Sequence, residues 1–394
     1  MKYRKLLALM LGIFLILSSF TGCKKEAAEE SQETSTQEST VSNTSQGTLE
    51  ASGSQNSSET SSASNESTSE SSEESSKEPE PAGPVLISDP NMNPLTGEIL
   101  DHVVSNKRPV AFTIDNHPFA IPAVGVGEAD IIFEGIIEGG ATRMLAIFQE
   151  LPDDIVIGGS RSLRHSFIDF AACFDAIIAH CGCSNLAQDA LARRGYDDID
   201  ALLNGGHLFY RDPWRLANLE YVHSLVTTGE AINDYLENDA PFRTEHEGYT
   251  CNMTFTETPV VVGGNLMTDI DIFFGDYVHA IFTFDPLTND YTFKENDVTY
   301  YDYATGEAVR FKNLVVIRTD VWVCDGVHQD MALTGEGDGY FMVNGAMAPI
   351  KWTRETEDSQ FVLTYEDGSP VIFGVGTTYI AVVNEYGGVS AYEE

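Results

Sequence analysis

The chain has 394 residues and a formal net charge of −39 at pH 7. At about 100–200 residues per domain, this length predicts two or three domains. A charge this negative argues against nucleic-acid binding and against docking on anionic lipid through basic side chains, so no nucleic-acid partner is expected.

Residues 1–23 are predicted to be an export signal. A basic segment (Met1–Lys5) precedes an apolar run (Leu6–Phe20) that is too short for a resident membrane helix. The segment Phe20-Thr21-Gly22-Cys23 resembles a bacterial lipobox, in which the cysteine is diacylated and becomes the new N-terminus. We therefore expect a lipoprotein whose lipid on Cys23 anchors it to the outer face of the cell membrane, in a Gram-positive-type envelope.

Residues 24–84 are rich in Ser, Thr, Glu, Gln and Asn and contain almost no apolar side chains. Such a segment cannot bury enough apolar surface to offset the loss of chain entropy on folding. We expect a disordered tether that holds the folded part away from the membrane.

The region 85–250 is predicted to be a mixed α/β domain. It begins with a strand over 109–115, and two strand patterns over 130–137 and 141–149 flank Gly139-Gly140. Two glycines between strands favour a type I′ hairpin, because that turn needs two positive φ angles. Period-2 alternation would then place Glu134, Glu138 and Arg143 on one polar face. The implied pairs are Glu138–Ala141, Ile136–Arg143 and Glu134–Leu145.

The segment 154–184 carries the most compact set of polar groups. We expect a strand over 155–157, a helix capped by Ser160, and a second strand over 176–179 that ends at His180. Arg161 and Arg164 would lie in the first helical turn, where the helix dipole disfavours cations. They are explained if they help to hold an anion at the helix N-terminus. Salt bridges to carboxylates elsewhere in this acidic chain explain them equally well.

The region 251–394 has short strand patterns separated by Gly, Asn and Asp, which predicts a mostly antiparallel β section. Within it, Asn344-Gly345 is a candidate hairpin turn. The expected fold class for the whole chain is therefore α+β.

Five cysteines remain besides Cys23, an odd number that excludes a complete disulfide framework. The Cys181-Gly-Cys183 spacing is too short for an ordinary metal knuckle, and no Cys or His pair lies at zinc spacing. We expect small buried residues, with a redox or metal role as the less favoured alternative, and no metal site. The five are Cys173, Cys181, Cys183, Cys251 and Cys324.

Several segments together resemble the YerB-like lipoprotein family, whose globular part is a domain of unknown function with an N-terminal and a C-terminal section. They are Ile114–Pro118, Glu138–Arg143, Ile157–Arg164 and the residues after His180. Gly159 stands where the family pattern has proline, and Val222–Thr227 keeps the family histidine, His223, but not the neighbouring asparagine and tyrosine. The resemblance implies no activity or cofactor. The residues that match the family pattern are Asp115, Asn116, Glu138, Thr142, Arg143, Arg161, Ser162, Arg164, His180 and Ser184.

Three functional hypotheses follow. The first is a surface-tethered protein that binds an anionic cell-wall ligand. The second is an envelope hydrolase or phosphotransferase with His180 and Asp115 as catalytic groups. The third is a scaffold that docks other envelope proteins. No GxSxG or HExxH motif is present, so binding is favoured over catalysis. The candidate ligand-binding residues are Asn116, Glu138, Arg143, Ser160, Arg161, Arg164, Ser184 and His223.

Overall fold

A computed structural model describes residues 84–384 and 388–392 of the chain. The predicted signal peptide, the lipidation site at Cys23 and the tether up to residue 83 lie outside the described residues. Within the described part, no helix is long and apolar enough to span a membrane.

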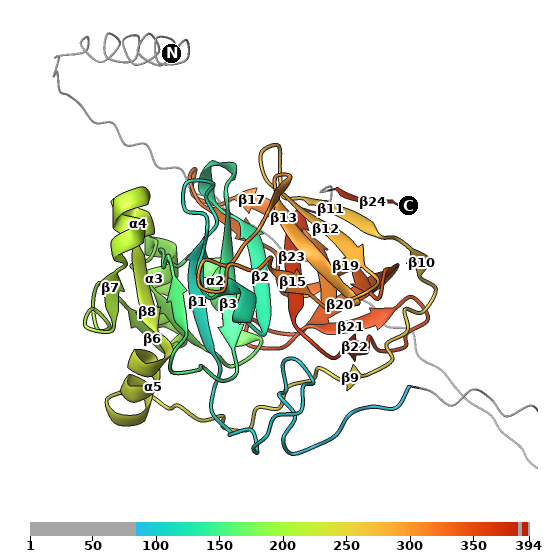
Figure 1. Ribbon diagram of the computed structural model, residues 1–394, viewed down its shortest axis with the longest axis horizontal. Helices are drawn as coiled ribbons and strands as arrows, with labels where there is room; N and C mark the ends of the chain where they lie inside the picture. The colour runs from blue at the N-terminus through green and yellow to red at the C-terminus, as the bar shows by residue number, and fades with distance from the viewer. Residues whose placement is uncertain (1–83, 385–387, 393–394) are drawn as a thin grey trace, which may run out of the picture. The chain divides into compact units, whose positions relative to one another are not determined.

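A large mixed sheet runs through both the N-terminal and the C-terminal section (Figure 1). Its strand order is β10-β20-β19-β16-β23-β2-β3-β1-β5-β6, with β21 paired to β20. The sections join where β2 pairs in parallel with β23, with Ile131 opposite Thr378. The N-terminal strands are β1 (Val110–Asp115), β2 (Ile131–Ile136), β3 (Thr142–Phe148), β5 (Ile177–His180) and β6 (Asp198–Asp200). The C-terminal strands are β10 (Asn265–Leu266), β16 (Asn313–Thr319), β19 (Gly335–Val343), β20 (Ala346–Arg354), β21 (Val362–Tyr365) and β23 (Thr378–Asn384).

A second sheet is antiparallel and lies wholly in the C-terminal section. It comprises β11 (Asp269–Phe273), β12 (His279–Asp285), β13 (Asp290–Glu295), β14 (Val298–Thr299), β15 (Arg310–Phe311) and β24 (Val389–Tyr392). The small sheets are β4 (Val156–Gly158) with β7 (Phe209–Arg211) and β8 (Leu225–Thr228), β17 (Val321–Val323) with β18 (Gln329–Met331), and β9 (Phe255–Thr256) with β22 (Phe373–Gly374).

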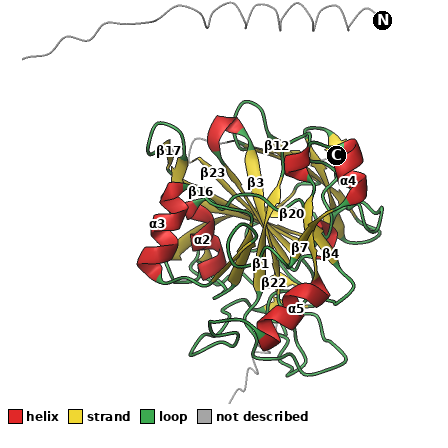
Figure 2. Cartoon of the chain, turned by 90° about the vertical axis from the view of Figure 1, so that its left-hand side faces the viewer, coloured by secondary structure: helices red, strands yellow, loops and turns green. Residues whose placement is uncertain are grey.

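The described helices are few, short and confined to the N-terminal section, where Figure 2 shows α3, α4 and α5 at the outside of the strands. The described part is therefore richer in strands than the predicted balance of helix and strand. The α-helices are α2 (His165–Ala172), α3 (Asn185–Arg194), α4 (Pro213–Asn218) and α5 (Gly229–Asn238), and the 3-10 turns are η1 (Val126–Glu128), η2 (Glu138–Gly140) and η3 (Tyr221–His223).

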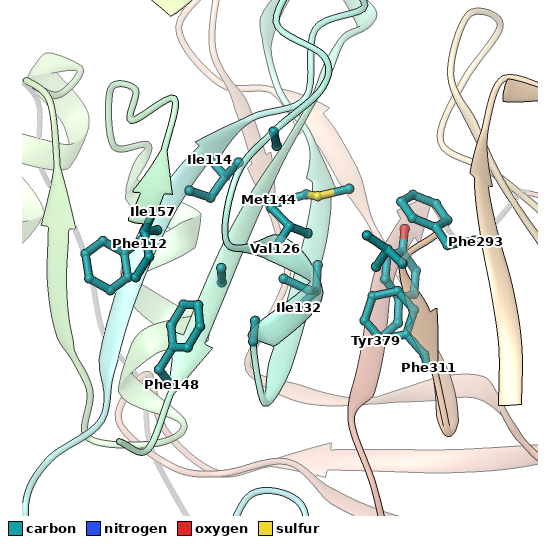
Figure 3. Close-up of a cluster of buried hydrophobic side chains, with 14 of the residues drawn as sticks. Phe112, Ile114, Val126, Ile132, Met144, Phe148, Ile157, Phe293, Phe311 and Tyr379 are labelled. Carbon is teal, nitrogen blue, oxygen red and sulfur yellow. The ribbon is translucent and has the colours of Figure 1, made fainter. Parts of the chain in front are cut away.

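The large sheet is buried on both faces, so its central strands are apolar throughout rather than alternating. Phe133 stacks on Phe170 of α2 on one face, with ring centroids 4.7 Å apart. On the other face the core is continuous from Phe112 and Phe148 to Tyr379 and Phe293 of the C-terminal section (Figure 3). Each face of the sheet thus has a core cluster to which both sections contribute.

The hairpin between β2 and β3 exists, but its predicted register is wrong by one residue. The backbone N–H of Ile137 bonds the carbonyl of Ala141, so the loop is a three-residue 3-10 turn rather than a two-residue turn. Glu134 pairs with Met144, and Arg143 pairs with Gly135. Because neighbouring side chains point to opposite faces, Arg143 lies on the face away from Glu134.

The helix start predicted at Ser160 is also wrong. Helix α2 begins at His165 with Arg164 as its N-cap residue, and no side chain caps it. Ser160 is instead bridged to Ile114 of β1, and the chain then runs beside the segment after β5, with Leu163 bridged to Cys183. Arg161 therefore does not lie in a helical turn, and the dipole argument does not apply to it. In contrast, the predicted Asn344-Gly345 turn is confirmed, since Val343 pairs directly with Ala346.

Candidate functional site

The end of β1 brings together the first group of candidate residues around Asp115. This carboxylate is 3% exposed, and its Oδ2 lies 2.6 Å from Nδ1 of His223 and 3.1 Å from Nε of Arg161. The backbone places them: the N–H of Asp115 bonds the carbonyl of Gly159, and the N–H of Arg161 bonds the carbonyl of Thr113. One buried carboxylate thus holds a histidine and an arginine from two separate loops.

His117 continues this group towards solvent. Its ring stacks on that of His223 with centroids 6.1 Å apart, and its backbone N–H bonds Oδ1 of Asp115 at 3.3 Å. Beyond it, Phe119 is 67% exposed. The Asp115 group is therefore bordered by rings at the surface.

The three predicted arginines gather at this end of the sheet. Arg164 makes a two-pronged pair with Glu138, in which Nε donates to Oε2 at 2.8 Å and Nη2 donates to Oε1. Burial opposes ionisation of Glu138, but the Arg164 hydrogen bonds hold its pKa at about 2. Arg143 is 3% exposed and donates to the carbonyl of Ser162. Burial lowers the pKa of Arg143 to about 10; the charges of Arg164 and Arg161 act in the same direction, and those of Asp115 and Glu138 oppose it.

Arg143 differs from the other two arginines in its partners. Among the described residues, no carboxylate forms an ion pair with its guanidinium, and its Nε has no hydrogen-bond partner. A buried charge is normally paired, because removing it from water is costly. Arg143 is therefore the one arginine of the three without a direct carboxylate contact among the described residues, although the charges of Asp115 and Glu138 act on it.

Arg215, which sequence reasoning missed, fixes the backbone at His223. It is 1% exposed and donates to the carbonyls of Ala120 and Pro122 in the loop after β1 and to that of His223, so it joins these two segments to α4. Burial lowers its pKa. Its only sequence signal was a basic residue three positions after Asp212, whose carboxylate caps α4.

His180 and Ser184 have structural partners. The ring nitrogens of His180 contact the Gly182 carbonyl at 2.9 Å and Oδ2 of Asp198 at 3.1 Å, which leaves neither nitrogen free. Ser184 caps α3 by accepting the N–H of Ala187. Ser160, in contrast, is 2% exposed, and its hydroxyl has no hydrogen-bond partner in the described part of the chain.

Asn116 belongs to a second buried polar group, on the other face of the sheet. Its Nδ2 donates to Oε1 of Glu134 at 2.8 Å and to Thr142, while the hydroxyl of Tyr379 donates to Oε2 of Glu134 at 2.6 Å. Burial raises the pKa of Glu134 to about 7, against the opposing effect of these hydrogen bonds. Burial and the charge of Glu134 also raise the pKa of Glu295, which is 3% exposed. Sequence reasoning had not linked these residues.

Comparison with known proteins identifies the family. The family model described as "Protein of unknown function (DUF3048) N-terminal domain" matches residues 95–243, and the corresponding C-terminal domain model matches residues 270–380. The chain belongs to the DUF3048 family. A curated DUF3048 relative, "Putative lipoprotein YerB" of Bacillus subtilis (strain 168), is 28% identical over 299 residues, which cover 74% of this chain and 85% of the relative. A crystal structure of YerB protein from Bacillus subtilis matches with a TM-score of 0.65 and 26% identity, covering 76% of this chain and 99% of that chain.

The family assignment confirms the resemblance drawn from the motifs. The N-terminal DUF3048 match contains Asp115, His223 and all three clustered arginines, and the C-terminal match contains Glu295 and Tyr379. The group around Glu134 is therefore built from both DUF3048 sections. The descriptions of the family and of the relative name no activity.

Proposed function

We propose that this DUF3048 protein is a lipid-anchored envelope protein that binds an anionic ligand, bearing phosphate or carboxylate, at Arg143, Arg161 and Arg164. The observation that carries the proposal is the buried guanidinium of Arg143, which has no carboxylate partner among the described residues. An anion at this point would supply the missing charge. The side chains of Arg161 and Arg164 are 29% and 14% exposed, so a ligand would reach the cluster past them.

The anchor part of the proposal rests on the lipobox ending at Cys23 and on the name of the Bacillus subtilis relative, a putative lipoprotein. A lipid on Cys23 followed by a polar segment of some 60 residues would place the folded part at the outer membrane face, within reach of wall polymers. Anionic polymers of the envelope are therefore the ligand class that we favour.

The rim of the site adds a preference for a ligand with a ring or apolar face. The guanidinium of Arg211 lies 4.0 Å from the ring centroid of Tyr221, which is 64% exposed. Arg211 donates to the carbonyl of Tyr221 and Arg161 to the carbonyl of the next residue, Val222, so the two arginines lie near each other. Exposed aromatic rings beside arginines suit a sugar-containing anion, whose ring stacks while its charge is bound.

A second candidate function is an envelope hydrolase or phosphotransferase, favoured by the Asp115–His223 contact. A carboxylate at Nδ1 fixes the orientation of an imidazole and leaves Nε2 to take up or deliver a proton. In this reading His223, rather than the predicted His180, would be the acid–base group. The arginines would then stabilise charge that develops on the substrate.

The test is a titration of the full chain in detergent with phosphate, pyrophosphate and anionic wall fragments. The readout is the thermal stability of the protein at each ligand concentration. A ligand that binds only the folded state stabilises it by about 2.7 kcal/mol at a hundredfold excess over Kd. Arg143→Met and Arg161→Ala should weaken the effect by roughly tenfold or more in Kd, since each removes a charge-assisted hydrogen bond. Arg193→Ala is the matched control, because Arg193 is exposed and paired with Glu357.

An absence of stabilisation by every anion, or equal losses in the Arg193→Ala control, would overturn anion binding at this cluster. The enzyme alternative is tested by His223→Gln. If the protein turns over a bound phosphorylated fragment, this variant should lose turnover and keep binding. Binding without turnover in the unaltered protein would leave the first function and exclude the second for that ligand.

A further inference from the structure

Helix α2 and the β17–β18 hairpin bring three potential metal ligands together. Nitrogen, sulfur and oxygen atoms of His165, Cys324 and Asp330 all lie within 4.8 Å of one another. Nε2 of His165 is 3.0 Å from Oδ1 of Asp330. No other group of three such side chains is found among the described residues.

The local structure explains how these side chains meet. His165 is the first residue of α2, and Asp330 pairs with Trp322 across the hairpin. The N–H of Cys324 bonds the carbonyl of His328, which closes the hairpin and holds Cys324 next to the end of β17. Met331, the residue after Asp330, is buried in the core below α2, so the hairpin is fixed against the helix.

The half-buried imidazole of His165 is only partly satisfied: Nε2 meets Asp330 as an ion pair, and Nδ1 has no hydrogen-bond partner among the described residues. Both ring nitrogens are shielded from solvent, and neither makes a hydrogen bond with any described residue. The approach of Nε2 to Asp330 has the distance of an ion pair without the geometry of a hydrogen bond. Leaving buried polar atoms unsatisfied is costly, so a group that binds these nitrogens would stabilise this corner.

We propose that His165, Cys324 and Asp330 bind a transition-metal ion of the zinc class. Imidazole nitrogen, thiolate sulfur and carboxylate oxygen are the ordinary ligands of Zn²⁺, whereas Ca²⁺ and Mg²⁺ prefer oxygen ligands only. Three protein ligands leave a fourth position for water or for a ligand atom. Cys324 is exposed, so both the ion and the fourth ligand can reach the site from solvent.

The site has two consequences for the molecule. It links the two DUF3048 sections, since His165 lies in the N-terminal match and Cys324 and Asp330 lie in the C-terminal match. Its first ligand, His165, directly follows Arg164, whose guanidinium donates a hydrogen bond to Glu138. The metal proposal stands on the three ligands alone and does not depend on anion binding by the arginines.

The test uses the full chain in detergent, stripped with a chelator under reducing conditions and titrated with Co²⁺ and then Zn²⁺. We expect about one ion per chain, with the thiolate-to-cobalt charge-transfer absorption of a bound cysteine. Cys324→Ser should abolish this absorption, and Asp330→Asn should weaken binding by roughly tenfold or more. Cys181→Ser and Asp325→Asn are matched controls for another thiol and for another carboxylate of the same hairpin, and both should bind as the unaltered protein does.

Cys324 is exposed, so Cys324→Ser should fold, which circular dichroism checks. The proposal is overturned if the unaltered protein binds no stoichiometric cobalt or zinc. It is also overturned if Cys324→Ser keeps both the absorption and the affinity, because the ion would then be bound elsewhere.

Discussion

Nδ1 of His223 lies 2.6 Å from Oδ2 of Asp115, a residue 108 positions earlier in the chain. The same carboxylate oxygen lies 3.1 Å from Nε of Arg161. A single buried oxygen therefore hydrogen-bonds a histidine ring and forms an ion pair with a guanidinium at the end of β1. This arrangement makes Asp115 the residue on which the geometry of the proposed anion site depends.

Replacing Asp115 should accordingly cost stability as well as ligand binding. We expect Asp115→Asn to lower the free energy of unfolding by roughly 2–4 kcal/mol, because it leaves Arg161 without its counter-charge in a partly buried position. Urea unfolding followed by circular dichroism measures this loss. The control is Asp101→Asn, since the Asp101 side chain is fully exposed in its pair with His102 and its replacement should leave the free energy of unfolding unchanged. Equal effects of the two changes would contradict the role given to Asp115.

Replacing Arg143, in contrast, should cost ligand binding but little stability. Its charge is buried without a carboxylate partner, so a flexible apolar side chain of similar length should be tolerated in its place. We expect Arg143→Met to change the unfolding free energy by no more than about 1 kcal/mol in the absence of anions, while anion-dependent stabilisation is lost. Thermal unfolding with and without ligand separates the two quantities. A loss of stability that is the same with and without anions would assign Arg143 a purely structural role.

Ser184 was predicted to bind ligand, and its position now predicts something else. Its hydroxyl caps α3 through the N–H of Ala187. Ser184→Ala should therefore cost about 1 kcal/mol of stability without changing any ligand affinity, whereas Ser184→Asp should restore most of the loss, because Asp also caps helices well. Chemical unfolding and ligand titration of both variants check this. A change in affinity in Ser184→Ala at unchanged stability would return Ser184 to the binding site.

Local patterns in the sequence were enough for some elements and insufficient for others. Consecutive apolar residues correctly indicated β1 and β5, and the Asn344-Gly345 pair marked its hairpin. At Gly139-Gly140 both glycines have positive φ as expected, but Glu138 joins them in a 3-10 turn and the register changes by one residue. Turn length depends on how the strands pack in the sheet, which two glycines do not determine.

The site was predictable in part where its residues are close in the sequence and obscure where they are not. Arg143, Arg161 and Arg164 were grouped as candidate ligand-binding residues, but the hairpin face and the helical turn on which this grouping was based are not those of the structure. The choice of His180 over His223 as catalytic group was less well founded, since the partners of His180 are a turn carbonyl and Asp198, and His223 depends on the remote Asp115. Contacts such as Tyr379 with Glu134, 245 residues apart, have no local signal at all.

The buried carboxyl of Glu134 should make the stability of the protein depend on pH. Burial raises its pKa from 4.5 to about 7, so the folded state holds this proton more tightly than the unfolded chain does. Its contribution to stability is fully present below about pH 4.5 and is lost as the pH rises through about 7. One pKa unit corresponds to about 1.4 kcal/mol, so the loss from this group is roughly 3 kcal/mol.

Glutamine at this position keeps the shape and accepts a hydrogen bond but does not titrate. We therefore expect Glu134→Gln to be less sensitive to pH between about 4.5 and 8 than the unaltered protein, and to be the more stable of the two at pH 8. Urea unfolding across this range measures the difference. The control is Glu237→Gln, an exposed carboxyl in the same section, which should follow the unaltered curve. If Glu134→Gln also follows that curve, the buried carboxyl does not carry the pH dependence.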